Sequence, residues 1–435
     1  MPETPSPFDL VVIGSGPGGY IAAIRAAQLG LKVACIEKEP RLGGTCLRIG
    51  CIPSKALLDA SERFTYARHR GAEIGLKFTD LQIDIAALMR RKDKVVDQLT
   101  GGVAGLFKKN KITRIQGAGK FLSAGEIEVN DNGSRTTLRA GKVLIATGSE
   151  PVELPFMKFD GKRILNSEQA LALAAVPKKM VVIGAGAIGL ELGSVWSRLG
   201  AQVTVLEMFT TILPGADEEL ARATERVLKK QGLTFFLGAK VTGATVKDEN
   251  ISIAFEWEGK QMQEVADTAL VAVGRKPYTA GLGAAEIGVK FDSRGRIVVD
   301  KRFQTSVPQV FAIGDVIAGP MLAHKAEEEG VACAELIVNR AGHVNYDVIP
   351  NVVYTSPELA SVGLTEEQLK AQKRAYVVGR FKFTANGRAL CMDEAEGLVK
   401  VIADQASDKV LGVHILGPQA SSLIAEAALA MEFGA

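Results

Sequence analysis

The chain has 435 residues, of which 47% are hydrophobic and 23% charged, with a formal net charge of +3. These values indicate a globular protein of roughly three domains, at ~150 residues per domain, and exclude the dense basic surface typical of nucleic-acid binding. Every apolar run is shorter than the ~18 residues of a membrane span, and five cysteines, an odd number, do not form a secreted disulfide framework. We therefore expect a cytoplasmic protein with small-molecule partners, and no nucleic-acid or membrane partner.

A first nucleotide-binding unit is predicted near the N-terminus. Its strand, glycine-rich turn, helix and second strand are residues 8–13, Gly14-x-Gly16-x-x-Gly19, residues 20–29 and residues 32–36. The glycines permit a tight turn and a close approach of the backbone to a pyrophosphate, and Gly30 ends the helix. Glu37 stands 18 residues after Gly19, near the distance at which an acid reaches a ribose hydroxyl in a βαβ fold. One such motif alone is weak evidence.

Two cysteines follow in the segment Gly43-Gly44-Thr45-Cys46-Leu47-Arg48-Ile49-Gly50-Cys51-Ile52-Pro53-Ser54-Lys55. Its glycines and small residues let the backbone bend until the sulfurs of Cys46 and Cys51 approach within bonding distance. Pro53 suits the first turn of a helix, so Cys51 would lie at a positive helix end that favours its thiolate. Buried structural thiols or half of a zinc site are the alternatives, but four intervening residues and the lack of a second cysteine pair fit metal binding poorly. We predict a redox pair beside a bound nucleotide.

This segment resembles the active-site signature of the FAD-dependent pyridine nucleotide-disulfide oxidoreductases, and its continuation to Leu58 resembles the dihydrolipoyl dehydrogenases within that family. The resemblance extends from about Phe8 to the last residue. It implies noncovalently bound FAD, with Cys51 next to the flavin and Cys46 as the outer sulfur that exchanges with substrate. Arg48 stands where the family usually carries Asn, and we expect its charge to favour the thiolate without abolishing the chemistry.

The glycine pattern recurs at Gly184-x-Gly186-x-x-Gly189, after a predicted strand at residues 180–183. Three landmarks pair at the same displacement of 170 residues: Gly14 with Gly184, Gly30 with Gly200, and Glu37 with Glu207. Two such units imply two dinucleotides, and the resemblance assigns FAD to the first and the nicotinamide nucleotide to the second. Glu207 would accept hydrogen bonds from a 2'-hydroxyl and repel a 2'-phosphate, and no Arg follows it, so NAD is predicted.

The resemblance also implies which residues contact each cofactor. For FAD these are Gly14, Gly16, Gly18, Gly19, Glu37, Lys38, Gly44, Thr45, Lys55, Gly119, Thr147, Gly148, Ser149, Asp315, Met321, Leu322, Ala323 and His324. For NAD these are Gly184, Gly186, Ile188, Gly189, Glu191, Glu207, Val241 and Gly274. Asp315 would bind the ribityl chain, and the backbone from Met321 to His324 would lie by the isoalloxazine. Without the resemblance, Asp315 is equally well explained as a helix or turn cap.

The catalytic residues implied by the resemblance are Cys46, Cys51, Lys55 and Glu191. Lys55 would lie by the flavin, and Glu191 would pair with it at the nicotinamide. Isolated charged residues are usually solvated, but these two lie four residues after Cys51 and two after Gly189. No metal site is predicted. The other cysteines, Cys35, Cys333 and Cys391, are expected to be small buried hydrophobic residues.

Exchange with a dithiol substrate also needs a base near neutrality, for which histidine is suited. None of His69, His324, His343 and His414 resembles the His-Pro-Thr-x-x-Glu catalytic segment of the family. His414 is predicted in a buried strand, and His69 and His343 are predicted at the surface. Family members continue for ~30–40 residues beyond the position of Ala435, so we expect the last domain to be truncated.

The predicted fold is α/β, with two Rossmann-like dinucleotide-binding domains and an incomplete α+β dimerisation domain. The expected boundaries are residues 1–149 for the FAD domain with the redox disulfide, 150–278 for the NAD domain, 279–348 for a segment that completes the FAD site, and 349–435 for the interface domain.

The resemblance implies an NAD-dependent dihydrolipoyl dehydrogenase that works as a homodimer. Its partner would be the lipoyl domain of a dihydrolipoyl acyltransferase or the carrier protein of a glycine cleavage complex. The alternatives are a mercuric or glutathione reductase, or a flavoprotein that binds FAD and NAD without turning over lipoamide. Glu207 and the pair Ser54-Lys55, in place of the usual Lys-Lys, disfavour a glutathione reductase. A missing N-terminal metal-binding extension disfavours a mercuric reductase.

Overall fold

The computed structural model describes residues 8–435, which divide into two compact units. The first contains residues 8–53, 93–150 and 275–344, and the second contains residues 54–92, 151–274 and 345–435. Helices α3 (Cys51–Arg70) and α4 (Ile85–Lys109) each contribute residues to both. None of the helices within residues 8–435 has the length and apolarity needed to cross a membrane.

The first unit is built on a mostly parallel sheet. Its elements are β1 (Phe8–Ile13), α1 (Pro17–Gln28), β2 (Val33–Glu37), α2 (Gly44–Ile49), β3 (Thr113–Gln116), β4 (Ala118–Ser123), β5 (Glu126–Asp131), β6 (Ser134–Ile145), β7 (Ser149–Pro151), β16 (Arg275–Pro277), β17 (Val310–Ala312), the 3-10 turn η1 (Gly314–Val316) and α8 (Ala323–Ile337). Strands β3, β2, β1 and β6 run in that order, with β17 parallel to β6. The first half of β6 pairs instead with the antiparallel strand β5. The central strands are apolar on both faces, as expected for a parallel sheet that is covered on both sides.

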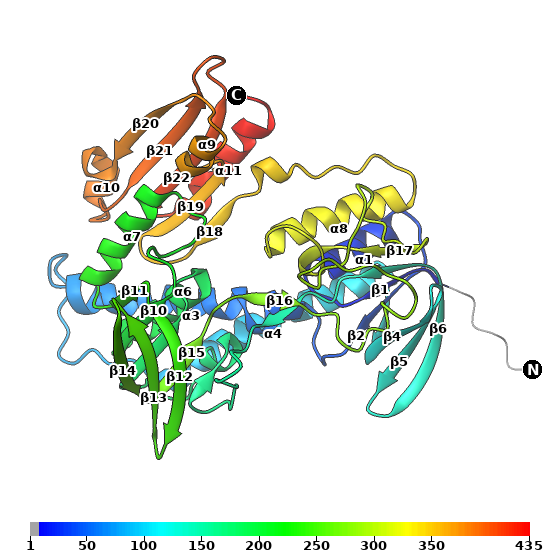
Figure 1. Cartoon of the computed structure of the whole chain (residues 1–435), viewed down its shortest axis with the longest axis horizontal. Coiled ribbons are helices and arrows are strands. Elements are labelled where there is room, and N and C mark those ends of the chain that lie inside the picture. The colour runs from blue at the N-terminus through cyan, green and yellow to red at the C-terminus, as the bar shows by residue number, and fades with distance from the viewer. Residues whose placement is uncertain (1–7) are drawn as a thin grey trace, which may run out of the picture. The chain divides into compact units, whose positions relative to one another are not determined.

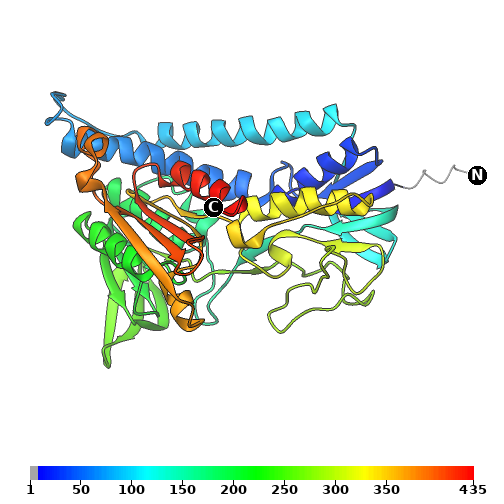
Figure 2. The same ribbon diagram turned by 90° about the horizontal axis from the view of Figure 1, so that it is seen from above.

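Helices α1 and α8 lie side by side in the first unit (Figures 1 and 2). Glycine permits this approach: a Cβ at Gly330 would lie 2.7 Å from the carbonyl oxygen of Gly18. Two polar contacts join the same helices. Arg25 forms an ion pair with Glu335 at 2.5 Å, and the Tyr20 hydroxyl donates to Glu327 at 3.0 Å. Helix α8 is therefore fixed to the helix that follows the first glycine loop.

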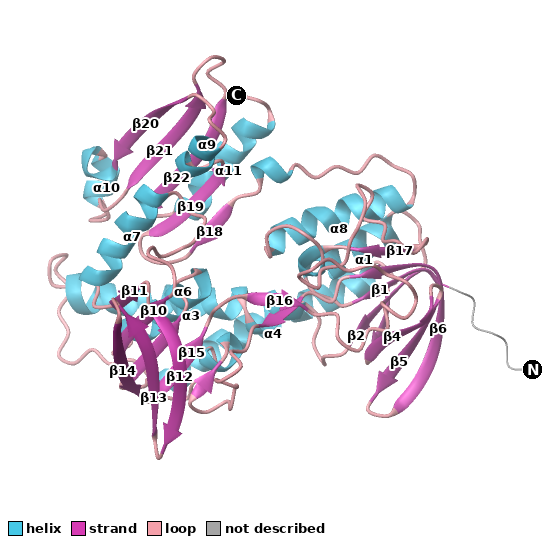
Figure 3. Ribbon diagram, viewed as in Figure 1, coloured by secondary structure: helices cyan, strands magenta, loops and turns pink. Residues whose placement is uncertain are grey.

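The second unit begins with another parallel sheet, whose strand order is β11-β10-β9-β15-β8. Its elements are β8 (Ile164–Leu165), α5 (Ser167–Ala170), β9 (Lys179–Ile183), α6 (Ala187–Arg198), β10 (Gln202–Glu207), α7 (Glu218–Lys230), β11 (Thr234–Leu237), β12 (Lys240–Lys247), β13 (Asn250–Trp257), β14 (Lys260–Ala266) and β15 (Thr268–Val271). Strands β12 to β14 form a separate antiparallel sheet, seen in Figure 3.

The two parallel sheets repeat one another as the sequence predicts. Both bounds of α6 lie 170 residues after those of α1, and the second strand of each sheet ends at the predicted acid, Glu37 or Glu207. Each unit also has an antiparallel three-stranded segment, which is β4 to β6 within the first sheet and the separate sheet of β12 to β14 in the second unit. The prediction of two Rossmann-like units is therefore confirmed.

The C-terminal part of the second unit is an antiparallel sheet with helices, which confirms the predicted α+β character. Its elements are η2 (Tyr346–Val348), β18 (Asn351–Val353), β19 (Glu358–Gly363), α9 (Glu366–Ala371), β20 (Tyr376–Lys382), η3 (Phe383–Ala385), α10 (Gly387–Cys391), β21 (Leu398–Asp404), β22 (Val410–Gly417) and α11 (Ala420–Glu432). Strand order is β18-β19-β22-β21-β20. Helix α11 packs against β19 and β22, where Ile424 joins Val362 and Ile415 in one apolar cluster.

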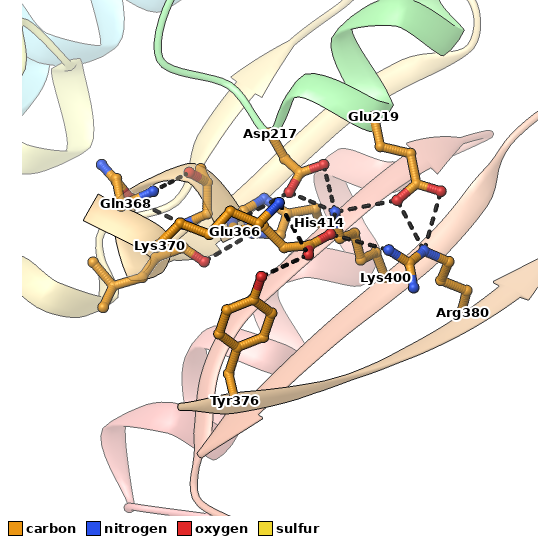
Figure 4. Close-up of polar contacts among 11 residues, drawn as sticks. Asp217, Glu219, Glu366, Gln368, Lys370, Tyr376, Arg380, Lys400 and His414 are labelled. Atoms are coloured by element: carbon orange, nitrogen blue, oxygen red, sulfur yellow. Dashed lines mark hydrogen bonds and ion pairs between the residues drawn. The ribbon is translucent and has the colours of Figure 1, made fainter. Parts of the chain in front are cut away.

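A network of charged side chains lies on this sheet (Figure 4). Lys400 on β21 is 1% exposed, and its Nζ lies 2.7 Å from Asp217, 3.1 Å from Glu219 and 2.5 Å from Glu366. Arg380 on β20 donates to both Glu219 and Glu366. Since Asp217 and Glu219 flank the first residue of α7, the network joins this helix to the C-terminal sheet within the second unit.

Replacing Lys400 with Ala should lower the free energy of unfolding by about 3–5 kcal/mol, because it leaves the fully buried Asp217 carboxylate without its cation. Lys370→Ala is the matched control. Lys370 pairs with the same Glu366 but is 62% exposed, so its loss should cost about 0–1 kcal/mol. Urea denaturation of both variants measures the difference, and equal destabilisation would contradict a special role for the buried lysine.

The same network predicts a dependence of stability on pH. Burial alone would raise the pKa of Glu366, but hydrogen bonds from Lys400 and Tyr376 hold it at about 2, below the ordinary value of 4.5. A carboxyl group whose pKa is lowered by folding stabilises the folded state. The full stabilisation is present above the pKa of the unfolded state, and it is lost as the pH falls towards the pKa of the folded state. The unfolding midpoint of the wild type should therefore exceed that of Glu366→Gln at neutral pH. This advantage should shrink between about pH 4.5 and 2; an advantage that is constant over that range would refute the assignment.

One burial prediction is wrong. Cys35 and Cys333 are fully buried, as expected, but Cys391 is exposed. Cys391 is the last residue of the short helix α10, whose neighbouring Leu390 is also 58% exposed. The tendency of cysteine to be buried does not hold on such a short surface helix.

Candidate functional site

The first glycine loop lies between β1 and α1. Gly14 has φ +100°, and a Cβ there would lie 2.4 Å from the carbonyl oxygen of Ala146. A Cβ at Gly19 would lie 2.0 Å from the Gly14 oxygen. At Gly16, by contrast, the nearest atom would be 3.9 Å away. The first and third glycines thus allow close packing, and the second leaves the space that a pyrophosphate needs at a helix N-terminus.

The second loop, between β9 and α6, repeats this arrangement. A Cβ at Gly184 would lie 2.4 Å from the carbonyl oxygen of Ala272, and one at Gly189 would lie 2.0 Å from the Gly184 oxygen. At Gly186 no atom lies within 4 Å. The open second glycine therefore occurs in both units.

The two predicted acids, Glu37 and Glu207, accept backbone hydrogen bonds at equivalent places in the two units. Glu37 accepts hydrogen bonds from the backbone N–H of Ser15 and of Glu39, each at 3.0 Å. Glu207 accepts from the N–H of Ala185 at 2.6 Å and of Phe209 at 2.9 Å. Each carboxylate is 6% exposed and retains acceptor capacity for ribose hydroxyls.

The cysteine segment packs directly on the first loop. Gly44 has φ +57°, and a Cβ there would lie 2.4 Å from the Cα of Gly16. The N–H of Gly43 donates to the carbonyl oxygen of Ser15 at 3.0 Å. Only glycine at position 44 allows this approach, so the segment that carries the thiols is held against the loop itself.

The two thiols occupy different helices. Cys46 lies within α2 and Cys51 is the first residue of α3, with Gly50 between the helices. Pro53 falls in the first turn of α3, as predicted, so Cys51 lies at the positive end of that helix. Both side chains are partly exposed. In contrast, burial raises the pKa of the Cys35 and Cys333 thiols, which keeps them protonated and unreactive.

Arg48 does not supply the free positive charge expected of it. Its guanidinium forms an ion pair with Glu39 at 3.0 Å, and its side chain is 13% exposed. It also donates to the carbonyl oxygen of Gly44 at 3.4 Å. The charge of Arg48 is thus largely balanced, and the residue ties α2 to the segment after β2.

Ser149 and Asp315 meet in the first unit, although 166 residues separate them. The Ser149 hydroxyl donates to the Asp315 carboxylate. Arg275 joins them, because its Nε lies 2.7 Å from the Ser149 hydroxyl and its terminal nitrogen 2.6 Å from the Ser149 carbonyl oxygen. Burial lowers the pKa of Arg275, and the Asp315 charge opposes this shift. The neighbouring Gly274 is predicted to contact NAD, and no local pattern in the sequence points to this contact of Arg275.

A second group gathers at the end of β6. The Thr147 hydroxyl donates to the carbonyl oxygen of Tyr278 at 2.6 Å, and the Tyr278 N–H donates to Gly148 at 2.9 Å. The Lys38 ammonium lies 4.0 Å from the centre of the Tyr278 ring. Three residues predicted to contact FAD thus meet around Tyr278, which the sequence did not single out.

The other predicted FAD residues lie in the same unit, except Lys55. Gly119 is on β4, with its Cα facing Ile13 and Ile36, and Thr45 is in α2. Met321 and Leu322 precede α8, and Ala323 and His324 form its first turn. Helix α8 contacts η1, where Asp315 lies.

Lys55 and Glu191 form the ion pair that the resemblance implies, at 2.9 Å. Glu191 lies in α6 and its side chain is 7% exposed, so the solvated alternative does not hold for it. Its second oxygen accepts the N–H of Tyr354 at 3.0 Å, and the Lys55 ammonium lies 4.2 Å from the centre of the Tyr354 ring. Lys55 also lies one helical turn after Cys51 on α3.

The remaining predicted NAD residues belong to the second unit. Ile188 is in the first turn of α6, Val241 is on β12, and Gly274 follows β15 with φ +118°. Met208 and Phe209, directly after Glu207, are 65% and 53% exposed. No arginine occurs in this stretch, as NAD rather than NADP requires.

The histidines are placed as predicted, with His69 and His343 exposed and His414 buried on β22. His414 Nε2 donates to the carbonyl oxygen of Leu364 at 3.0 Å, and burial lowers the pKa of this histidine. The imidazole ring is therefore neutral and packed inside the protein, so His414 is unsuited to be a catalytic base.

The residues present fit both cofactors. Each unit offers an open glycine at a helix N-terminus and an acid at the end of the second strand, which together suit the pyrophosphate and ribose of a dinucleotide. Only the first unit adds a pair of thiols and an acid anchored by Ser149. A flavin nucleotide therefore suits the first unit and a nicotinamide nucleotide the second.

Comparison with known proteins agrees with this geometry. Residues 8–330 match the family described as pyridine nucleotide-disulphide oxidoreductase, and residues 349–435 match its dimerisation domain. The mitochondrial dihydrolipoyl dehydrogenase of Pisum sativum is 53% identical over 98% of this chain and 86% of its own length. Dihydrolipoyl dehydrogenase 3 of Pseudomonas putida is 52% identical over 98% and 92%.

Among solved structures, the Cu(II) complex of the HOCl-induced flavoprotein disulfide reductase RclA from Escherichia coli has a TM-score of 0.87 and 27% identity. The match covers 99% of this chain and 93% of that one. The chain belongs to the pyridine nucleotide-disulphide oxidoreductases, a family of flavoprotein enzymes, and it uses FAD and NAD as cofactors.

Proposed function

We propose that this chain is a dihydrolipoyl dehydrogenase, which oxidises protein-bound dihydrolipoamide to lipoamide and reduces NAD⁺. One observation carries the proposal: Gly44 packs on Gly16, so the Cys46/Cys51 segment lies against the first dinucleotide loop. Relatives with about 50% sequence identity over nearly the whole chain carry this name, which supports dihydrolipoamide as the substrate.

The thiols perform the exchange with substrate. A thiolate of dihydrolipoamide attacks the sulfur of Cys46 in the Cys46–Cys51 disulfide, and Cys51 leaves as a thiolate. The second substrate thiol then displaces Cys46 from the mixed disulfide, which releases lipoamide and leaves both cysteines reduced. Bound FAD would pass the electron pair from the cysteines to NAD⁺. The position of Cys51 at the start of α3 supports its role as the leaving thiolate, because the positive helix end favours negative charge.

Lys55 and Glu191 are proposed to orient the nucleotides, and Asp315 to bind the sugar side of FAD. Support comes from the Lys55–Glu191 pair and from the hydrogen bond between Ser149 and Asp315. The domain boundaries that we propose are those predicted from the sequence, at residues 149, 278 and 348. The enzyme would act as a homodimer through residues 349–435 and serve a lipoyl domain of a 2-oxoacid dehydrogenase or glycine cleavage complex. A cytoplasmic location stays a prediction, since relatives include mitochondrial proteins.

Cys46→Ser should lower dihydrolipoamide oxidation by at least about a thousandfold, because the exchanging sulfur is removed. NADH oxidation by an artificial electron acceptor should persist, since it needs only the two nucleotide sites. Cys391→Ser, which removes an exposed cysteine outside these sites, is the control and should change neither rate. Full lipoamide activity in Cys46→Ser would refute the dithiol mechanism. A wild type that oxidises NADH without turning over lipoamide would favour the alternative of a cofactor-binding form.

Glu207→Ala should reduce the preference for NADH over NADPH by at least about tenfold, because the carboxylate accepts from the ribose and repels a 2'-phosphate. Glu37→Ala is the matched control, since Glu37 occupies the same place in the first loop. It should weaken FAD binding and leave the nucleotide preference unchanged. The ratio of kcat/KM for the two nucleotides measures the effect, and an unchanged ratio in Glu207→Ala would disprove the assignment of the second loop.

A further inference from the structure

Two charged side chains of α8 are completely buried in the first unit. Lys325 and Glu329 are one helical turn apart, their charged groups lie 3.0 Å from each other, and both side chains are 0% exposed. Neither belongs to the residues assigned to the cofactors above. Burial of an ion pair carries a large desolvation cost, and apolar residues of similar volume are often as stabilising. The role of this ion pair must therefore come from the groups that the two side chains contact.

Both groups hold the backbone of one residue, Gly314. The Glu329 carboxylate accepts the Gly314 N–H at 2.7 Å. The Lys325 ammonium donates to the carbonyl oxygen of Gly314 at 3.2 Å and to that of Ala318 at 3.3 Å. Gly314 has φ +76°, in the left-handed region, so its peptide groups are turned towards α8 in a conformation that other residues rarely adopt.

Gly314 is followed directly by Asp315. The N–H and C=O of Gly314 set the direction of the chain as it enters Asp315, and the Asp315 carboxylate is held on its other side by Ser149. Helix α8 is in turn anchored to α1 by the contact of Gly330 with Gly18 and by the Arg25–Glu335 pair. The buried pair therefore connects Asp315 to the helix that carries the first glycine loop.

We propose that the Lys325–Glu329 pair positions Asp315 for FAD, acting through the backbone of Gly314. The inference rests on the proposed role of Asp315 at the flavin nucleotide. Lys325 and Glu329 are positioning residues, since the groups that they hold are the backbone of Gly314 and, for Lys325, the carbonyl oxygen of Ala318. Charge-assisted hydrogen bonds suit this task, because they are directional and stronger than neutral ones.

The test is a double-mutant cycle of Lys325→Met and Asp315→Asn, read out as the FAD dissociation constant of the apoprotein. Lys325→Met alone should raise this constant about tenfold to a hundredfold, the loss expected for hydrogen bonds to a charged group. In the Asp315→Asn background, Lys325→Met should raise the FAD dissociation constant less than about threefold, because the effects of residues that act through one another are not additive. Glu328→Gln is the control: it removes the charge of an exposed residue of α8 next to Glu329 and should leave FAD affinity within about twofold.

The apoprotein unfolding midpoint of each variant separates positioning from general instability. If Lys325→Met does not fold, Lys325→Met combined with Glu329→Gln takes its place in the cycle, since it leaves no buried charge unpaired. Equal loss of FAD affinity in both backgrounds would overturn the positioning role while leaving the role of Asp315 intact. Unchanged affinity in Asp315→Asn would overturn both. Failure of both Lys325 variants to fold, beside a folded Glu328→Gln, would assign the pair to the core and also overturn the proposal.

Discussion

The close contact between Gly16 and Gly44 is the constraint on which the rest of the site depends. A side chain at position 44 would collide with the Cα of Gly16, so the thiol-bearing segment reaches the first loop only because residue 44 is glycine. This contact places Cys46 and Cys51 next to the position of a bound dinucleotide, within one unit, on α2 and at the first residue of α3. The chemistry of the family, in which thiols and a nucleotide exchange electrons, requires that proximity.

The remainder of the site follows from one nucleotide-binding fold used twice. Both copies keep the open second glycine and an acid that accepts one backbone N–H from the glycine loop and one from the residue two positions after the acid. They differ in what is added. The first copy gains the cysteine segment and the return of the chain through β16, β17 and α8, which brings Arg275 and Asp315 to Ser149. The second gains the Lys55–Glu191 pair and, through Lys400, a buried ionic connection to the C-terminal sheet.

Local patterns in the sequence predicted most of the fold and the central part of the site. Glycine spacing located both loops, and the 170-residue displacement of the landmarks recurs in the bounds of α1 and α6, because turn geometry is determined by neighbours in the chain. Arg275, Tyr278 and the Lys325–Glu329 pair were not found. Their roles depend on segments more than a hundred residues away or on complete burial, and a buried lysine is indistinguishable in sequence from a solvated one. The contact between Arg48 and Glu39 was missed for the same reason, since it is visible only in the folded chain.

The most direct measurement is a count of reactive thiols before and after anaerobic reduction by NADH. Thiols are blocked with an alkylating reagent, and the modified residues are mapped by mass spectrometry of the folded holoenzyme. We predict that reduction exposes two additional thiols, Cys46 and Cys51, and that Cys46→Ser shows no such gain. A pair already alkylated before reduction and unchanged by NADH, in an enzyme that still oxidises dihydrolipoamide, would contradict the claim that these cysteines carry the electrons between substrate and NAD.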